Sequence, residues 1–394
     1  MTVRNGREFL SIPGPTTVPD EVLAAMHRPA QDIYAAPIVT LTESILSDLR
    51  KVFRTSGPTF IYIGNGHGAW EAALANVLSP GDGVLVLKSG RFAAGWGEMA
   101  AALGAQVETL AGDQHRAVDP AALESRLRED REGRIRAILV VQVDTASGVA
   151  NDIPALRRAI DAAGHDALLM VDAIASLATM PFEMDEWGVD VAVTCSQKGL
   201  MMSPGLSFIA AGEKALAVHE TAHSRTRYWD WTFRRGEEHY MKYCGTAPVH
   251  LLFGLRKSLD MLLEEGLENV FRRHRLLADA VQAAVAVWVE GGTLNFNITE
   301  PAERAPSVTT ILTGDQDPAP LLAYCREKCG VVLGLGIGEL KGRAFRIAHM
   351  GHVNAPMVLG TLAVAEMGLA ATGMPHGRGG VQAAVESLAR AVPA

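Results

Sequence analysis

The chain has 394 residues, and its 36 Lys and Arg against 44 Asp and Glu give a formal net charge of −8. Because phosphate binding needs clustered basic residues, this balance excludes nucleic acid as the main partner. Hydrophobic residues make up 48% and charged residues 20%, which excludes intrinsic disorder, and four cysteines exclude a disulfide framework. No stretch of about eighteen apolar residues occurs, so we expect a soluble, cytoplasmic protein.

Short apolar runs, each ending in a turn or a polar cluster, recur along the first half of the chain. They cover residues 60–66, 84–90, 137–144, 167–172, 191–196 and 206–211. Their hydrophobicity is continuous rather than alternating, which predicts strands covered on both faces. Stretches of helical spacing lie between them, at 71–78, 95–103 and 153–163. The alternation predicts an α/β fold with a mostly parallel sheet, whose ligands gather at the carboxyl ends of the strands.

The second half of the chain changes to long amphipathic helices over 250–266 and 269–288, followed by short strands near 307–313 and 344–351. This pattern predicts a smaller α+β domain that a helix near 250–265 joins to the first, with a terminal helix after Gly380. We therefore expect an N-terminal arm over 1–15, a large domain over 16–262 and a small domain over 263–394.

Lys198 stands two positions after the apolar run 191–196 and precedes a Pro-Gly turn at Pro204 and Gly205. An amine at the end of a buried strand has a lowered pKa and can act as a Schiff-base nucleophile. The alternative is a surface lysine whose stem packs on the strand end.

Asp172 ends the apolar run 167–172. A carboxylate at the end of a buried strand needs a partner, which a protonated ring nitrogen provides. The alternative is an N-cap for the following segment.

The segment from Gly64 to Gly68 reads Gly-Asn-Gly-His-Gly and stands between an apolar run and a helical stretch. Its glycines let the backbone approach a ligand, and the N–H groups of a helix start suit a phosphate. A dinucleotide fingerprint is the alternative, but Ala69 replaces its third glycine and no acidic strand end follows about twenty residues later.

A phosphate cradle, a strand-end carboxylate and a strand-end lysine together suit pyridoxal phosphate. The sequence resembles the class V aminotransferases of fold type I, and within them the serine–glyoxylate and alanine–glyoxylate aminotransferases. The motifs that carry the resemblance cover nearly the whole chain: residues 13–16, 64–68, 171–172, 196–198, 243–248 and 346–347. The resemblance implies a large domain with a mostly parallel seven-stranded sheet and a smaller C-terminal α+β domain.

The resemblance also implies a role for each matching residue. Lys198 forms the internal aldimine and moves the proton, and Asp172 pairs with the pyridine nitrogen. Arg346 binds the α-carboxylate of the substrate. The other cofactor contacts fall to Asn65, Gly66, His67 and Gln197 at the phosphate, Phe92 stacked on the ring where relatives often carry Trp, Thr145 at the ring oxygen, Ile174 on the opposite face, and Tyr243 and Thr246 at the phosphate of the neighbouring subunit.

The resemblance implies a homodimeric aminotransferase that moves the amino group of a small amino acid, serine or alanine first, to a 2-oxo acid such as glyoxylate. Alternatives in the same fold are an aspartate–glyoxylate or pyruvate-linked aminotransferase, including the pyridoxamine–pyruvate type, and a lyase or cysteine desulfurase. A nicotinamide-dependent oxidoreductase and a non-catalytic binding protein also stay open. Cys325 and Cys329 have helical spacing but no further ligand nearby, so we expect no metal.

Overall fold

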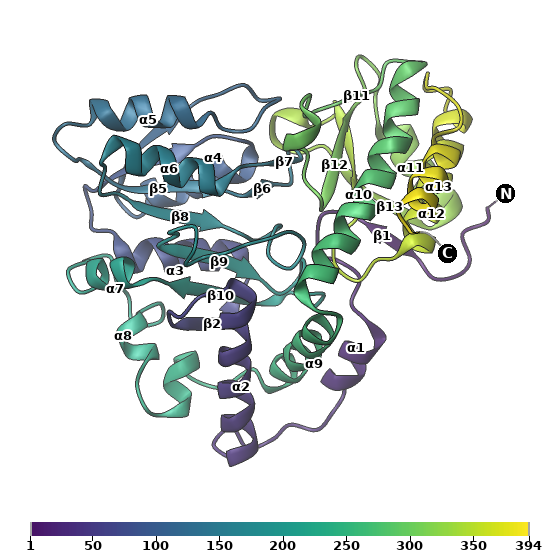
Figure 1. Cartoon of the computed structure of the whole chain (residues 1–394). Helices are drawn as coiled ribbons and strands as arrows, with labels where there is room; N and C mark the ends of the chain where they lie inside the picture. Colours follow the sequence, from purple (N-terminus) through teal and green to yellow (C-terminus); the bar gives the residue numbers. More distant parts are fainter. Residues whose placement is uncertain (1, 393–394) are drawn as a thin grey trace.

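The computed structural model describes residues 2–392 and contains a seven-stranded and a five-stranded sheet (Figure 1). The larger sheet has the order β2-β10-β9-β8-β5-β3-β4. Its strands are β2 (Thr59–Gly64), β3 (Gly83–Leu87), β4 (Gln106–Leu110), β5 (Ile135–Val141), β8 (Leu168–Asp172), β9 (Val191–Cys195) and β10 (Gly205–Ala211). Only β10 runs against its neighbours. This confirms the predicted α/β fold with a mostly parallel seven-stranded sheet.

Helices cover both faces of this sheet, which explains why its strands read as continuous apolar runs. Phe60 and Tyr62 of β2 pack into one hydrophobic cluster and Ile61 packs into the other, as the alternation of side chains along a strand requires. One face carries α3 (Gly66–Val77), α4 (Arg91–Ala102), α7 (Glu213–His219) and α8 (Trp231–Arg234). The other carries α1 (Asp20–Met26), α2 (Ala36–Phe53), α5 (Pro120–Glu129), α6 (Ile153–Ala163) and α9 (Val249–Glu265).

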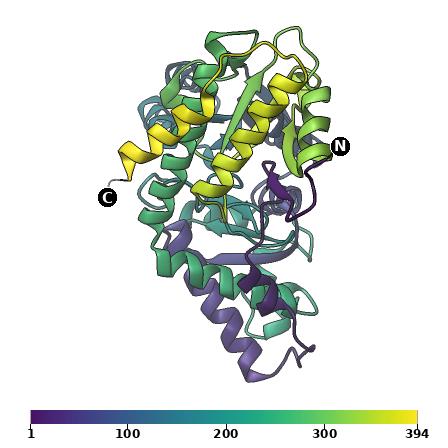
Figure 2. The ribbon, with the colours of Figure 1, turned by 90° about the vertical axis from the view of Figure 1, so that its right-hand side faces the viewer.

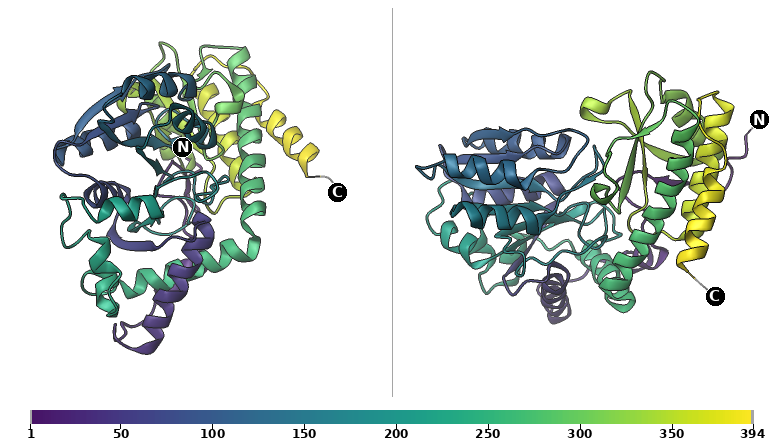
Figure 3. Two further views of the ribbon diagram at one scale, coloured as in Figure 1. Left: turned by 60° about the vertical axis from the view of Figure 1, so that its left-hand side comes forward. Right: turned by 45° about the horizontal axis from the view of Figure 1, so that its top comes forward.

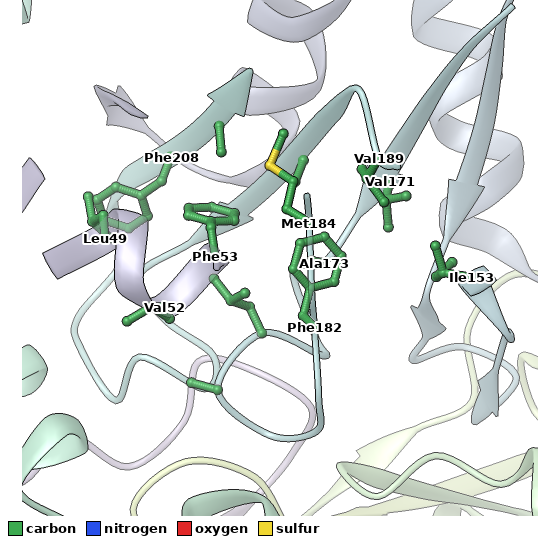
Figure 4. Packing of buried hydrophobic residues seen from close by; sticks show 14 of the residues in the cluster. Leu49, Val52, Phe53, Ile153, Val171, Ala173, Phe182, Met184, Val189 and Phe208 are labelled. Carbon is green, nitrogen blue, oxygen red and sulfur yellow. The ribbon is translucent and has the colours of Figure 1, made fainter. Parts of the chain in front are cut away.

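The face covered by α2 shows how this core is filled (Figure 4). Phe53 near the end of α2 meets Phe182 edge to face, with ring centroids 6.4 Å apart, and Leu49 lies one turn earlier beside Phe208 of β10. Each side chain of this kind that folding buries contributes about 1.5–3 kcal/mol. The strands are therefore held firmly between two layers of helices, and the residues that follow their carboxyl ends have fixed positions.

The smaller sheet has the order β1-β13-β14-β12-β11 and lies beside the larger one (Figure 3). Its strands are β1 (Phe9–Ser11), β11 (Asn295–Phe296), β12 (Val308–Leu312), β13 (Val331–Leu335) and β14 (Ala344–Ala348). Their apolar side chains pack against α10 (Leu267–Glu290), α11 (Ala319–Cys329), α12 (Ala355–Ala371) and α13 (Gly380–Ala391). Figure 2 shows these helices gathered around the smaller sheet. The predicted connecting helix is α9, and α10 follows it after Gly266 alone.

The remaining elements are short. A two-stranded ribbon of β6 (Val143–Asp144) and β7 (Val149–Ala150) follows β5, and η1 (His239–Tyr243), η2 (Pro301–Glu303) and η3 (Gly338–Leu340) are single turns. The N-terminal segment runs from β1 in the smaller sheet to α1 beside α9 (Figure 1). The domain boundaries at 15/16 and 262/263 stay a prediction. Among the described helices, none is long and apolar enough to span a membrane.

Candidate active site

A cavity of about 270 Å³ opens at the carboxyl edge of the seven-stranded sheet. The turn between β2 and α3, the start of α4 and the residues after β5, β8 and β9 form its wall. This is where the parallel order of the strands predicts a ligand site. The cavity brings together most of the residues singled out from the sequence: Asn65, Gly66, His67, Phe92, Thr145, Asp172, Ile174, Gln197 and Lys198.

Lys198 stands in the turn after β9, and its side-chain amine donates a hydrogen bond to the backbone carbonyl of Pro13. The hydroxyl of Thr16 donates to the Lys198 carbonyl at 3.0 Å, so the N-terminal segment is fixed across the lysine. Burial lowers the pKa of the Lys198 amine, because the charged form loses its hydration. The geometry therefore increases the share of neutral, nucleophilic amine at the cavity wall.

Asp172 ends β8 with its carboxylate held at both oxygens. The Ile174 backbone N–H donates to Oδ1 at 2.7 Å, and the indole N–H of Trp70 donates to Oδ2 at 2.8 Å. Burial raises the pKa of this carboxyl to about 7 despite both donors. Within residues 2–392 it forms no ion pair, so a cationic ring nitrogen would supply the missing counter-charge.

The side chain of Asn65 caps the N-terminus of α3. Asn65 is the N-cap, and its Oδ1 accepts hydrogen bonds from the backbone N–H groups of His67 at 3.1 Å and Gly68 at 3.3 Å. A Cβ on Gly66 would lie 2.5 Å from Cδ1 of Ile174, so a larger residue there would require the Ile174 side chain to move. The positive end of the helix dipole faces the cavity with the exposed His67 beside it.

The chemistry of this donor set fits pyridoxal phosphate. A nucleophilic amine, a buried carboxyl that lacks a counter-charge, and a helix N-terminus for an anion all line one cavity. The flat ring of Phe92 and the aliphatic side chain of Ile174 line the same space and suit the faces of an aromatic ring.

Arg346 reaches this region from β14 of the smaller sheet. Its Nε donates to the Leu335 carbonyl at 2.6 Å and its Nη1 to the Thr145 carbonyl at 2.8 Å. The side chain is 7% exposed, and burial lowers its pKa to about 10. Because Thr145 lines the cavity, the guanidinium is held directly behind the wall, and Nη2 makes no hydrogen bond to the described residues.

Tyr243 and Thr246 lie away from this cavity. Tyr243 is 1% exposed in the core, and its hydroxyl lies 2.8 Å from Oγ1 of Thr42. Within one chain this hydroxyl is used in the core, and the role of Tyr243 at the phosphate of a neighbouring subunit stays a prediction. Thr246 is exposed and lines a separate cavity of about 320 Å³ with His250.

Two residues of the site had not been singled out from the sequence. Trp70 lines the cavity and holds Asp172. Asp144 is fully buried, and one carboxylate oxygen accepts from the backbone N–H groups of Phe92 at 2.9 Å and Ala93 at 3.1 Å. Asp144 thereby fixes the start of α4 and with it the ring of Phe92, and burial raises its pKa. Its signal in the sequence is the same as that of Asp172, a carboxylate at the end of an apolar run.

A second cavity, of about 360 Å³, lies next to the first between the two sheets. Arg91 from the start of α4 and Glu339 from η3 both line it. Arg91 pairs with Glu98 through two hydrogen bonds of 3.0 and 3.1 Å, and Lys88 pairs with Glu339 at 3.0 Å. The charges on its wall are therefore matched within the chain.

The sequence matches the family model described as class V aminotransferase over residues 9–338. It is 39% identical to the serine–glyoxylate aminotransferase of Methylorubrum extorquens, over 100% of this chain and 98% of that protein. It is 38% identical to the L-aspartate–glyoxylate aminotransferase of Paracoccus denitrificans, over 95% and 94%. Pyridoxamine–pyruvate aminotransferase from Mesorhizobium loti superposes with a TM-score of 0.91 at 27% identity, over 100% of both chains.

Proposed function

Because the chain belongs to the class V aminotransferases, which use pyridoxal phosphate, we propose that it moves the amino group of serine to glyoxylate. Family membership confirms the resemblance read from the sequence, the cofactor and the enzyme class. The observation that carries the proposal is the placement of Lys198 and Asp172. Both line one cavity, their pKa values are shifted toward the neutral forms, and no ion pair between them forms within the described chain.

Pyridoxal phosphate supplies a conjugated ring that accepts the electron pair left on Cα when its proton departs. The side chains of the protein orient the cofactor and the substrate and transfer the protons. With the cofactor bound, Asp172 would face the pyridine nitrogen and favour its protonated form, and the Lys198 amine would take the proton from Cα of the substrate and return it to the cofactor carbon. Asn65, Gly66 and His67 at the start of α3, together with the side chain of Gln197, would hold the phosphate.

Arg346 binds the α-carboxylate of the substrate. Two of its nitrogens are committed to backbone carbonyls of Leu335 and Thr145, which fixes the plane of the guanidinium. A fixed planar donor orients the Cα–H bond relative to the ring, and that orientation selects transamination over decarboxylation. Thr145 and the Phe92 ring complete the wall around the cofactor.

The homodimer and the cytoplasmic location belong to the same proposal. Ile63 and Tyr228 are exposed, and the Tyr228 hydroxyl lies 3.5 Å from the Ile63 carbonyl, directly before the turn that starts α3. Tyr240 is a further exposed aromatic side chain, and apolar groups on a surface favour a subunit contact there. The four cysteines are free, which agrees with a reducing compartment.

An L-aspartate donor is the second candidate, because the relative from Paracoccus denitrificans is 38% identical. The desulfurase alternative has little support. Cys325 is buried on α11, and burial raises the pKa of its thiol to about 12. Cys195 lines the cavity but is 1% exposed, and burial raises its pKa to about 12 as well. A thiol in that state is a poor nucleophile.

The test is a matrix of donors and acceptors on purified protein loaded with pyridoxal phosphate. Product formation from serine and glyoxylate above that from every other pair supports the proposal. Reduction with borohydride followed by peptide mapping should place the cofactor on Lys198. Equal rates with every donor, or a label on another lysine, would contradict it.

Subunit sharing has a test of its own. Lys198→Ala and Thr246→Ala are each expected to be inactive, and a mixture of the two with verified subunit exchange should regain activity through one intact site. An inactive mixture counts against Thr246 serving the other subunit.

A further inference from the structure

Trp70 connects several parts of the cofactor cavity. It lies within α3 one turn after His67, is 1% exposed, and lines the cavity. Its ring centroid is 4.6 Å from that of His67 and 6.3 Å from that of Phe92. Its indole N–H donates to Oδ2 of Asp172 at 2.8 Å. One side chain therefore contacts residues assigned to the phosphate, to the ring face and to the ring nitrogen.

The orientation of this indole is fixed from both sides. Trp96 of α4 stacks on it with centroids 6.0 Å apart and an interplanar angle of 17°, while His67 lies on the cavity side. Turning the ring would break this packing as well as the hydrogen bond to Asp172. The N–H therefore stays directed at the carboxylate.

The hydrogen bonding of the Asp172 carboxylate depends on the indole N–H of Trp70. The Ile174 N–H holds only Oδ1, so without Trp70 the carboxylate loses its one donor at Oδ2. A buried acceptor that loses its donor keeps the cost of desolvation without the compensating hydrogen bond. The remaining lone pairs would also lose their fixed direction toward the cavity.

We propose that Trp70 is a positioning residue, which holds Asp172 in the orientation that pairs with the pyridine nitrogen of the cofactor. The inference rests on the proposed role of Asp172. It assigns Trp70 a function that ordinary core packing does not require, because a phenylalanine could fill much of the same space without an N–H.

The chain offers a matched control in Trp96. It is 0% exposed and stacks on Trp70, yet its indole nitrogen has no hydrogen-bond partner within the described chain. Trp70→Phe and Trp96→Phe thus remove similar volumes from the same stack, and only the first removes a donor to Asp172.

The experiment measures binding of pyridoxamine 5′-phosphate to the full-length cofactor-free chain by calorimetry, since this ligand forms no bond to Lys198. We expect Kd to rise at least about tenfold in Trp70→Phe and to change by less than about threefold in Trp96→Phe. In an Asp172→Asn background, Trp70→Phe should add no further loss. Equal Kd values for the two tryptophan variants would overturn the inference.

Two further comparisons distinguish a failure of the proposed role of Asp172 from a failure of the inference on Trp70. If Asp172→Asn alone leaves Kd unchanged, the proposed role of Asp172 fails; if it weakens binding and Trp70→Phe does not, only the inference on Trp70 fails. Should Trp70→Phe not fold, benzothienylalanine at position 70 keeps the shape of the ring and lacks the N–H. Normal binding by that variant would overturn the inference equally.

Discussion

The side-chain amine of Lys198 donates a hydrogen bond to the backbone carbonyl of Pro13, 185 positions earlier in the chain. The N-terminal segment thus crosses the candidate active site and accepts a hydrogen bond from the Lys198 amine. Gly14 makes this crossing possible, because its φ is +123° and a Cβ there would lie 2.5 Å from Nζ of Lys198. Access to the amine therefore depends on a residue without a side chain.

Gly14→Ala should reduce covalent attachment of pyridoxal phosphate, because the methyl group forces the Lys198 amine to move and a φ of +123° strains any residue with a side chain. Visible absorbance and borohydride labelling measure attachment. Gly6→Ala is the control, since Gly6 has a φ of +149° with no atom within 4 Å of its Cβ position. Similar behaviour of the two variants would show that strain, rather than the contact with Lys198, is responsible.

Asp172→Asn should reduce turnover sharply, because a neutral amide does not favour a protonated ring nitrogen. The same change should alter the pH dependence of stability in the cofactor-free protein. The folded pKa of Asp172 is about 7 against 3.8 for an ordinary carboxyl, so the folded state binds the proton more tightly than the unfolded state. This group therefore lowers the free energy of unfolding as pH rises from 3.8 to about 7.

The measurement is the melting temperature of cofactor-free wild type and Asp172→Asn between pH 5 and pH 8. The variant lacks this titration, so its stability relative to wild type should rise with pH across that window and level off above it. Asp166→Asn serves as the control, because the Asp166 side chain is fully exposed. A constant difference between Asp172→Asn and wild type would refute the raised pKa.

The sequence predicted the strands that are buried on both faces, because β5, β8 and β9 lie in the middle of the larger sheet and read as unbroken apolar runs. It did not predict β4, an edge strand with the sequence QVETL whose side chains are mostly exposed. It did not predict β13 either, whose sequence is VVLGL. The exposed side chains of β4 leave it without a hydrophobic run, whereas β2 at the opposite edge is mostly buried and was predicted.

For the site, the types of residue at the ends of the predicted strands were enough to predict most of the residues that line the cavity. Parallel strands end at one edge of the sheet, so these residues lie close together. They could not identify Trp70, since an aromatic residue inside a helix is typical of ordinary core. Nor could they show that Tyr243 points into the core of its own subunit. The direction of a side chain depends on packing between segments that are distant in sequence.

Tyr243→Phe distinguishes the observed position of this side chain from the role that the resemblance implies. Loss of the hydroxyl removes the hydrogen bond to Thr42, so the free energy of unfolding should fall by about 1 kcal/mol. Kd for pyridoxamine 5′-phosphate should stay unchanged. Tyr240→Phe, at a side chain that is 36% exposed, is the control. A weaker Kd with unchanged stability would instead place the Tyr243 hydroxyl at a phosphate.

The choice of donor depends on whether a second cation is free to bind a second carboxylate. Arg346 is assigned to the α-carboxylate, so aspartate needs another guanidinium near the site. Arg234 is 2% exposed and donates to the carbonyls of Ile61, Tyr228 and Lys242, which commits it to the fold. The other arginines between residues 225 and 235 line neither the cofactor cavity nor the cavity next to it; they are Arg225, Arg227 and Arg235.

Arg91 is the remaining candidate, because it lines the cavity next to Phe92, but its guanidinium makes two hydrogen bonds to Glu98. Breaking that pair to bind aspartate costs part of what the new pair gains, whereas serine needs no second cation. We therefore expect kcat/KM with glyoxylate to be at least tenfold higher for serine than for aspartate, about 1.4 kcal/mol of transition-state preference. Arg91→Ala should leave the value for serine unchanged within about twofold. If aspartate is the better donor and Arg91→Ala removes its advantage, Arg91 leaves Glu98 to bind the second carboxylate, and the preference for a neutral donor is wrong.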